Sequence, residues 1–202
     1  MDALLAEIRS CTACQGLPLG PRPILQAGAR ARILIAGQAP GRITHAKGIP
    51  FDDPSGNRLR DWLGVARATF YNPDCFAIIP MGFCFPGTGS GGDLPPRPEC
   101  APLWRAPLMA LLSNIEMTLL LGTYANEWHL GPARGERLAD RVALWRETFP
   151  RLVPLPHPSP RNIAWFRRNP WFEAELLPAL RVRIAEILHA PAGSGGDGPK
   201  PA

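Results

Sequence analysis

The chain has almost no lysine: Lys47 and Lys200 are the only two among 22 basic residues, and the others are arginine. It also lacks a long hydrophobic run, because its longest apolar stretches, such as residues 117–121, are far too short to cross a bilayer. No block is dominated by charge, and no internal repeat is present. These absences argue against a membrane span, a disordered chain and a repeat array. The arginine excess has two open explanations, a codon bias or a surface that faces phosphate groups.

What remains is the composition of an ordinary globular domain. The chain has 202 residues, 46% of them hydrophobic, and a net charge of +5. We expect one domain over residues 1–189 and a disordered Gly/Pro/Ser-rich tail over residues 190–202. Residues 1–10 predict an amphipathic helix without the basic-then-apolar order of a signal peptide. We therefore expect a cytoplasmic monomer without a membrane partner, whose cysteines are thiols or metal ligands rather than disulfides.

Short apolar runs alternate with amphipathic segments along the chain. This alternation predicts an α/β fold, a three-layer α/β/α sandwich with a central four-stranded parallel sheet. The predicted strands are 32–36, 76–81, 117–121 and 152–155, and the predicted helices are 55–63, 102–112, 137–148 and one from Pro170 that Pro178 could kink. The Gly/Pro-rich residues 85–99 predict an irregular surface loop, because they lack the Lys-Ser/Thr of a phosphate-binding loop.

Two short loops follow the first and the last predicted strand. The first loop reads Gly37-Gln38-Ala39-Pro40-Gly41, and the second reads His157-Pro158-Ser159-Pro160-Arg161-Asn162. In an open α/β sheet, ligands bind outside the carboxyl ends of the strands. Both loops are therefore expected on one edge of the sheet, where glycine allows close backbone approach and histidine handles a charge or a proton.

Four of the five cysteines have the spacing of a metal site. Cys11 and Cys14 form a Cys-x2-Cys pair, and Cys84 and Cys100 flank the Gly/Pro-rich segment. Four thiolates suit zinc or an iron–sulfur cluster, and ligand type alone leaves both open. Cys75 precedes an apolar strand, and we expect it to be a small buried hydrophobic residue that binds no metal.

Together these motifs resemble the uracil-DNA glycosylase superfamily. The signature loops of that superfamily are Gly-x-x-Pro-Gly after the first strand and His-Pro-Ser after the last. The four cysteines are similar to those of its iron–sulfur branches, classes four and five, and residues 48–56 resemble the Gly-x-Pro-Phe…Ser-Gly stretch of those branches. The resemblance extends from Cys11 to about Phe172.

The resemblance implies a fold, an activity and a cofactor. The implied fold is a four-stranded parallel sheet between helices. The implied activity is hydrolysis of the N-glycosidic bond of uracil, and of other deaminated bases, in DNA during base-excision repair. A [4Fe–4S] cluster on Cys11, Cys14, Cys84 and Cys100 would accompany it, with zinc as the alternative.

The same resemblance assigns roles to the loop residues. His157 would donate a hydrogen bond to the uracil oxygen on which negative charge develops, and Phe51 would stack on the flipped base. Ser159 would contact the DNA backbone, with Arg161 and Asn162 in the stretch that enters the groove. Gly37, Ala39 and Pro40 would form the substrate-facing loop. Without the resemblance, His157 would be interpreted as a structural histidine and Phe51 as a core aromatic.

One departure from the family concerns the catalytic carboxylate. Class-four enzymes usually place a glutamate where Gln38 stands, and an amide orients a water molecule but cannot accept its proton. Asp53 lies two residues before Ser55-Gly56, as the catalytic aspartate of class five does in its Asp-x-Ser-Gly stretch. Asp53 would then supply the carboxylate, with Gln38 holding the same water. The alternative is that Asp53 is the N-cap of the following helix.

A second departure concerns base recognition. Pro80 stands where the family usually has an asparagine that reads the uracil edge, and proline has no side-chain donor or acceptor. This predicts a broader base range and an atypical branch of the superfamily. The runner-up function is a non-catalytic iron–sulfur or zinc protein of the same fold that binds DNA lesions.

Overall fold

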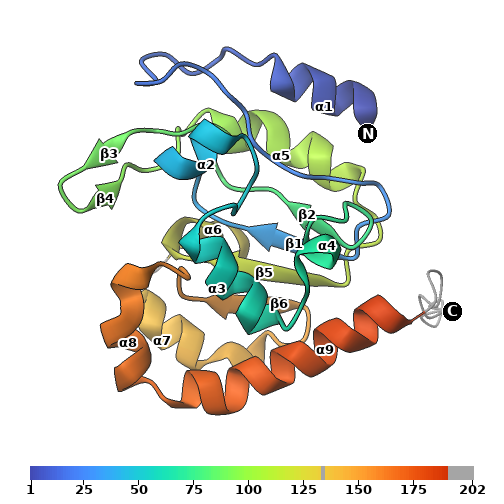
Figure 1. Ribbon diagram of the computed structural model, residues 1–202, viewed down its shortest axis with the longest axis vertical. Coiled ribbons are helices and arrows are strands. Elements are labelled where there is room, and N and C mark those ends of the chain that lie inside the picture. The colour runs from blue at the N-terminus through green and yellow to red at the C-terminus, as the bar shows by residue number, and fades with distance from the viewer. Residues whose placement is uncertain (133–134, 191–202) are drawn as a thin grey trace, which may run out of the picture.

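A four-stranded parallel sheet forms the centre of the molecule. The computed structural model describes residues 1–132 and 135–190, so the predicted tail lies, apart from Ala190, outside the described residues. The strand order is β2-β1-β5-β6 (Figure 1). The strands are β1 (Ile33–Ala36), β2 (Phe76–Ile78), β5 (Met117–Leu121) and β6 (Leu152–Leu155). All three strand pairs are parallel, as the sequence predicts.

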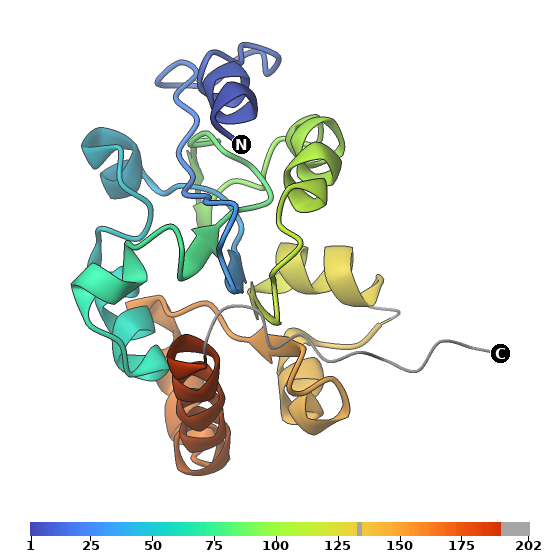
Figure 2. The same ribbon diagram turned by 90° about the vertical axis from the view of Figure 1, so that its right-hand side faces the viewer.

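Helices cover both faces of this sheet (Figure 2). Alternate strand residues point to opposite faces, so Ile33 and Ile35 belong to one core cluster, and Leu34 belongs to another. The first face packs on α3 (Pro54–Leu63), α7 (Leu138–Ala143) and α9 (Leu177–His189). The opposite face packs on α1 (Asp2–Arg9), α5 (Cys100–Ala110) and α6 (Thr123–Leu130). The predicted three-layer α/β/α sandwich is confirmed.

The predicted helices are present with shifted boundaries. The helix expected over 55–63 is α3, and the one expected over 102–112 is α5. The segment 137–148 divides into α7 and the 3-10 turn η1 (Trp145–Glu147). The final helix begins as a π-helical turn, η3 (Phe172–Leu176), and continues as α9. Pro178 explains the wide turn, because its nitrogen has no hydrogen to donate to the preceding turn.

Several short elements escape the sequence patterns. Three of them are short helices that the sequence analysis does not predict, because one or two turns carry too little periodicity to be recognised. They are α2 (Arg42–Lys47), α4 (Arg67–Phe70) and, after the 3-10 turn η2 (Pro160–Asn162), α8 (Ile163–Arg168). The expectation of an irregular loop over 85–99 is wrong in its centre, where β3 (Thr88–Gly89) and β4 (Gly92–Asp93) form an antiparallel hairpin. Glycine at the turn, including Gly92 at φ 136°, permits the tight reversal.

The carboxyl edge of the sheet is where the loops converge. Parallel pairing continues past the strand ends, since the Met81 N–H donates to the Gly37 carbonyl at 2.8 Å and the Gly82 N–H to the Gln38 carbonyl at 2.9 Å. The loops after β1 and β2 are thereby fixed against each other. Within residues 1–132 and 135–190, no helix is long and apolar enough to cross a membrane.

Candidate functional site

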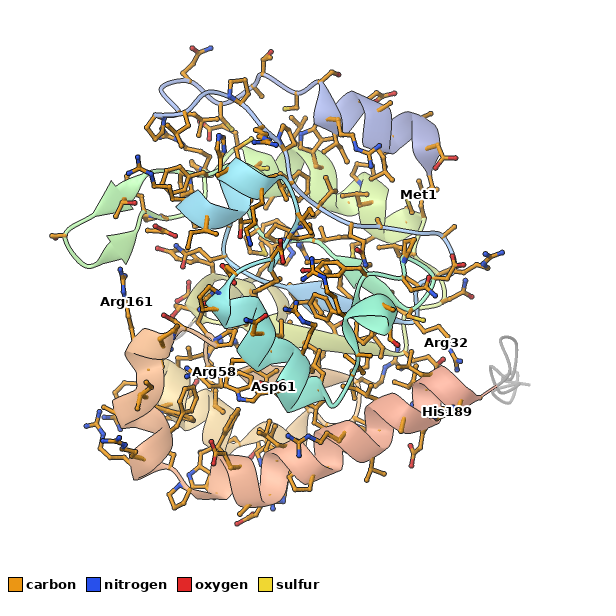
Figure 3. All side chains as sticks on the ribbon, in the orientation of Figure 1. Met1, Arg32, Arg58, Asp61, Arg161 and His189 are labelled. Carbon is orange, nitrogen blue, oxygen red and sulfur yellow. The ribbon has the colours of Figure 1, made fainter. Side chains whose placement is uncertain are left out.

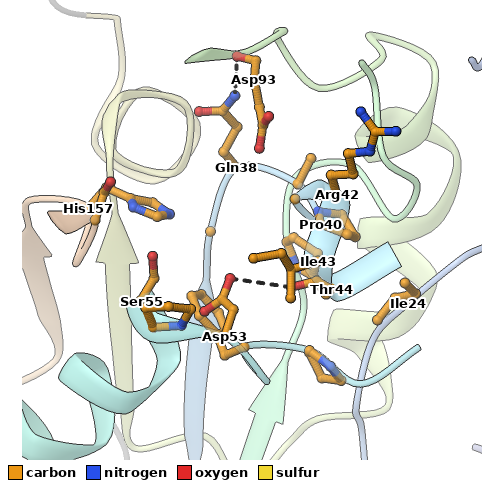
Figure 4. A pocket seen from close by; sticks show the side chains of 18 of the residues that line it. Ile24, Gln38, Pro40, Arg42, Ile43, Thr44, Asp53, Ser55, Asp93 and His157 are labelled. Carbon is orange, nitrogen blue, oxygen red and sulfur yellow. Dashed lines mark hydrogen bonds between the residues drawn. The ribbon is translucent and has the colours of Figure 1, made fainter. Parts of the chain in front are cut away.

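A cleft of about 420 Å³ lies at this edge of the sheet (Figure 4). Its walls come from the loop after β1, the segment before α3, the loop after β6 and the β3–β4 hairpin. The cleft brings together every residue that the sequence predicts to be catalytic and most of those predicted to bind substrate. They are Gly37, Gln38, Ala39, Pro40, Phe51, Asp53, His157, Ser159 and Arg161. Asn162 is the exception and does not line it.

His157 is partly buried, and its loop is held from two sides. Asn162 Nδ2 donates to the His157 carbonyl at 2.7 Å, so this side chain orients the loop from behind. Arg58 Nη1 donates to the Ser159 carbonyl at 3.0 Å. Burial lowers the pKa of His157, while the negative charges of Asp53 and Asp93 oppose that shift. The net direction favours a neutral imidazole at pH 7, with one ring N–H to donate.

Asp53 is both a helix cap and a wall of the cleft. Its Oδ1 accepts a hydrogen bond from the Gly56 N–H at 2.8 Å, which makes it the N-cap of α3. Its Oδ2 lies 3.5 Å from the Thr44 hydroxyl, which donates to it. The capping interpretation is therefore correct, and the same carboxylate also faces the cleft. A cap of this type fixes the position of the negative charge.

Gln38 is attached to the hairpin. Its Nε2 donates to the Leu94 carbonyl at 2.9 Å and to the Asp93 carbonyl at 3.3 Å. Both amide hydrogens are used on backbone groups, so the side-chain oxygen is the atom left to face the cleft (Figure 4). This atom accepts a hydrogen bond but cannot remove a proton.

Phe51 has a strained backbone and a constrained ring. Its φ of 55° is unusual for a residue with a side chain. Arg60, which is buried, donates to the Phe51 carbonyl at 3.2 Å and holds the conformation. A Cβ on Gly56 would lie 1.7 Å from that carbonyl oxygen, so glycine is required there. The Phe51 ring meets Phe70 edge-on at 6.4 Å and contributes to the wall of the cleft.

Ser159 and Arg161 occupy the mouth of the cleft. The Ser159 hydroxyl accepts a hydrogen bond from the Arg161 N–H at 3.2 Å and so begins the turn η2. The Arg161 guanidinium extends toward the β3–β4 hairpin (Figure 3), where its Nη1 lies 3.5 Å from the Gly91 carbonyl. Arg161 therefore spans the opening between the His157 loop and the hairpin.

The structure adds one acidic residue that sequence reasoning missed. Asp93 lies on β4 and lines the cleft. One sequence signal could have identified Asp93: it lies in the Gly/Pro-rich segment between Cys84 and Cys100, two of the predicted metal ligands. Treating that segment as an irregular loop concealed its relation to the cleft.

Pro80 also lines the cleft, at the end of β2. The buried guanidinium of Arg105 donates to the Ile79 carbonyl at 2.9 Å and to the Pro80 carbonyl at 3.4 Å. Pro80 thus has no N–H, no polar side chain and an already engaged carbonyl. Base recognition at this position must come from neighbouring residues.

The four predicted metal ligands surround a second, much smaller pocket. Cys11, Cys14, Cys84 and Cys100 all line it. Two sulfurs accept hydrogen bonds: Trp104 Nε1 donates to Cys11 Sγ and the Phe83 N–H donates to Cys100 Sγ, both at 3.3 Å. Burial raises the pKa of the Cys100 thiol to about 12. Cys75 lies elsewhere, against the core on the other face of the sheet.

Four cysteines are a donor set that suits either a single zinc ion or an iron–sulfur cluster. Among the residues that the structure describes, no three His, Cys, Asp or Glu side chains are arranged around one metal ion. A single zinc with four thiolates needs all sulfurs at about 2.3 Å from one point. A [4Fe–4S] cluster takes one cysteine at each of four separated irons, so its ligands stand farther apart. N–H···S hydrogen bonds to the sulfurs are also common around such clusters.

A comparison with protein families agrees with this geometry. Residues 26–181 match the family model described as the uracil DNA glycosylase superfamily. The matched range contains all four strands of the sheet and every cleft residue predicted from the sequence. Proteins of this superfamily are, in general, DNA glycosylases. With most of its length matched and the expected α/β/α sheet in place, the chain belongs to the uracil DNA glycosylase superfamily.

Proposed function

We propose that this protein hydrolyses the N-glycosidic bond of uracil, and of other deaminated bases, in DNA. The observation that carries the proposal is the cleft at the carboxyl edge of the sheet, which combines a histidine, an aromatic ring and a fixed carboxylate. His157, Phe51 and Asp53 come from distant parts of the chain and all line this cleft. A base flipped out of the duplex is the substrate that such a recess suits.

His157 supports the departure of the base. Cleavage of the glycosidic bond leaves negative charge on the base, and a positioned N–H donor stabilises that charge. A neutral imidazole serves this purpose, since it donates without carrying a charge of its own into the free cleft. The double attachment of its loop by Asn162 and Arg58 keeps the ring in place before substrate arrives.

Asp53 and Gln38 support the sugar and the water. The sugar becomes positively charged as the bond breaks, and the fixed carboxylate of Asp53 offsets that charge. The Gln38 side-chain oxygen is free to accept a hydrogen bond from the attacking water. Arg60 and Gly56 hold the backbone of Phe51 in place, and its ring would supply the face on which the flipped base stacks.

Base range follows from Pro80. A side chain without polar atoms discriminates weakly between bases that differ in their outer edges. We therefore infer that the enzyme removes hypoxanthine or xanthine in addition to uracil. The arginines at the cleft mouth, Arg42 and Arg161, would contact the phosphates of the DNA, with Ser159 beside them.

The cysteine pocket would hold a [4Fe–4S] cluster with a structural role. Cys11 and Cys14 would fix the N-terminal segment, and Cys84 and Cys100 would fix both ends of the segment that contains the hairpin. When bound, the cluster supplies four covalent anchors and no step of the hydrolysis.

A panel of duplex oligonucleotides, each with one uracil, hypoxanthine or xanthine, tests the proposed function. Purified protein in substoichiometric amount should generate abasic sites at uracil over several turnovers, and also at one or both of the purine lesions. Tight binding to the lesion without abasic sites would instead identify a non-catalytic lesion-binding protein.

A further inference from the structure

The β3–β4 hairpin brings a second carboxylate into the cleft. Asp93 extends from β4 on the side opposite Asp53, and the His157 ring points from a third side toward the space between the two (Figure 4). The charges of both aspartates act on His157 in the same direction, raising its pKa against the effect of burial. Asp93, Asp53 and His157 therefore face one shared space.

Three neighbours place this carboxylate. The Gln38 amide grips the hairpin at the carbonyls of Asp93 and Leu94. The Thr88 hydroxyl donates to Asp93 Oδ1 at 3.3 Å across the hairpin. A Cβ on Gly41 would lie 3.1 Å from Asp93 Oδ2, so glycine at the end of the loop after β1 leaves room for this oxygen. The side chain at position 38 thus holds the backbone from which Asp93 projects.

The two carboxylates differ in the oxygens that remain available. Both oxygens of Asp53 accept hydrogen bonds from the protein, one from the Gly56 N–H and the other from the Thr44 hydroxyl. Asp93 Oδ2 receives no hydrogen bond from any residue in the described part of the chain. An oxygen without a protein partner accepts a hydrogen bond from water without competition, which favours Asp93 Oδ2 as the proton acceptor.

We propose that Asp93 is the carboxylate that accepts the proton of the attacking water, a role that the amide of Gln38 cannot fill. This inference rests on the proposed glycosylase function. Gln38 becomes a positioning residue that holds the hairpin, and Asp53 keeps its role of offsetting the charge on the sugar. The β3–β4 hairpin, which Gln38 contacts, thus supplies the carboxylate that position 38 lacks.

The step balances as a hydrolysis. The bond between sugar C1′ and the base nitrogen breaks, and its electron pair leaves with the base as an anion that His157 hydrogen-bonds. The water oxygen bonds to C1′, and one water proton passes to Asp93 Oδ2. That proton is later released to solvent or to the departing base, so the products are an abasic sugar and the neutral base.

Single-turnover cleavage of a uracil-containing oligonucleotide tests this assignment in three variants. D93N keeps the size and the hydrogen-bonding capacity toward Thr88 and should slow cleavage by about a hundredfold or more. D93E returns a carboxylate to the same position while Gln38 keeps its hydrogen bonds to the hairpin, and it should recover at least about tenfold of that loss. D74N is the control, since Asp74 pairs with Arg30 on the exposed surface, and it should cleave at the wild-type rate.

Two results would overturn the assignment: D93N that cleaves within about threefold of the wild-type rate, or D93E that cleaves as slowly as D93N. A wild type that releases no base would instead overturn the proposed function. NMR titration of His157 tests the placement of Asp93 beside it without relying on activity. Asp53, Arg42 and Arg161 line the same cleft and are unchanged in D93N, so loss of the Asp93 charge should lower the His157 pKa, whatever the activity.

Discussion

The cleft and the cysteine pocket differ in how the fold builds them. The cleft lies at the carboxyl edge of the sheet, where loops after parallel strands meet, and it contains charged and polar groups of both signs. The cysteine pocket lies away from that edge, between the N-terminal segment, the residues after β2 and the start of α5, and its sulfurs are partly or fully buried. One site is suited to chemistry and the other to holding segments together.

A single segment joins these two regions. It begins at Cys84, ends at Cys100 on the first residue of α5, and carries Asp93 between them. A cluster bound by the cysteine pocket, as proposed above, would fix both ends of the segment that carries the hairpin and Asp93. Variants in the cleft should therefore act mainly on the rate, whereas variants in the cysteine pocket should change stability as well as rate.

The largest effect on rate is expected from His157→Ala. Loss of the donor should slow single-turnover cleavage at saturating substrate by about a hundredfold to a thousandfold, because nothing then stabilises the charge on the departing base. The melting temperature should stay close to that of wild type. A variant that cleaves normally but binds DNA weakly would make His157 a binding group.

Asp53 tests whether one carboxylate both caps a helix and assists the chemistry. Asp53→Asn keeps the size and most of the capping and should slow cleavage by about one to three powers of ten, with little change in melting. Asp53→Ala should in addition lose about 1 kcal/mol of stability. Full activity of the asparagine variant would reduce Asp53 to a helix cap.

The cysteine pocket should respond in stability first. Cys84→Ser should remove the visible absorption of the purified protein, lower the melting temperature and slow cleavage, since the hairpin loses one of its anchors. Cys75→Ser is the matched control, because Cys75 lies outside the pocket, and it should do none of these. If the wild type were colourless and contained stoichiometric zinc, the same four cysteines would bind zinc and the proposed cluster would be wrong.

A smaller effect on rate is expected at Asn162. Asn162→Ala removes the hydrogen bond to the His157 carbonyl. If the ~1 kcal/mol of that bond acts on the transition state, cleavage should slow about fivefold. Because the side chain supports the loop, the Kd for lesion-free DNA should not change. A large fall in that affinity would favour the original expectation that Asn162 contacts DNA.

A further effect concerns pH and lies outside both sites. Burial, aided by the charge of Arg105, lowers the pKa of His129 from 6.5 to about 4. The neutral form contributes stability that is fully present above about pH 6.5 and is lost as the pH falls toward 4. His129→Gln should therefore flatten the decline in unfolding free energy over that interval, measured by urea denaturation. An unchanged slope would contradict the depressed pKa.

The sequence predicts the framework well because the framework depends on periodicity. All four strands and the helices α3, α5 and α9 follow from apolar runs and spacing. The loops at 37–41 and 157–162 could be placed on one edge, since parallel strands end together. Gln38 and His157 belong to these two loops, whereas Asp53 is predicted only from the resemblance of residues 48–56 to the glycosylase superfamily.

The remaining details depend on contacts that periodicity does not encode. Asn162 points toward the His157 carbonyl because it lies in a 3-10 turn of three residues, which is too short to be predicted from periodicity. Asp93 enters the cleft because a two-stranded hairpin forms in a segment whose composition favours an irregular loop. The grip of Gln38 on that hairpin joins residues 55 positions or more apart. Such pairings are decided by the folded structure and not by local sequence.

The most direct measurement of the central claim is the release of free uracil, quantified by mass spectrometry, from duplex DNA in excess over the protein. Wild type should release more than one uracil per protein molecule, and His157→Ala should release it at least about a hundredfold more slowly. Release of no uracil by a folded, DNA-binding wild type would contradict the account, as would equal release by the two proteins.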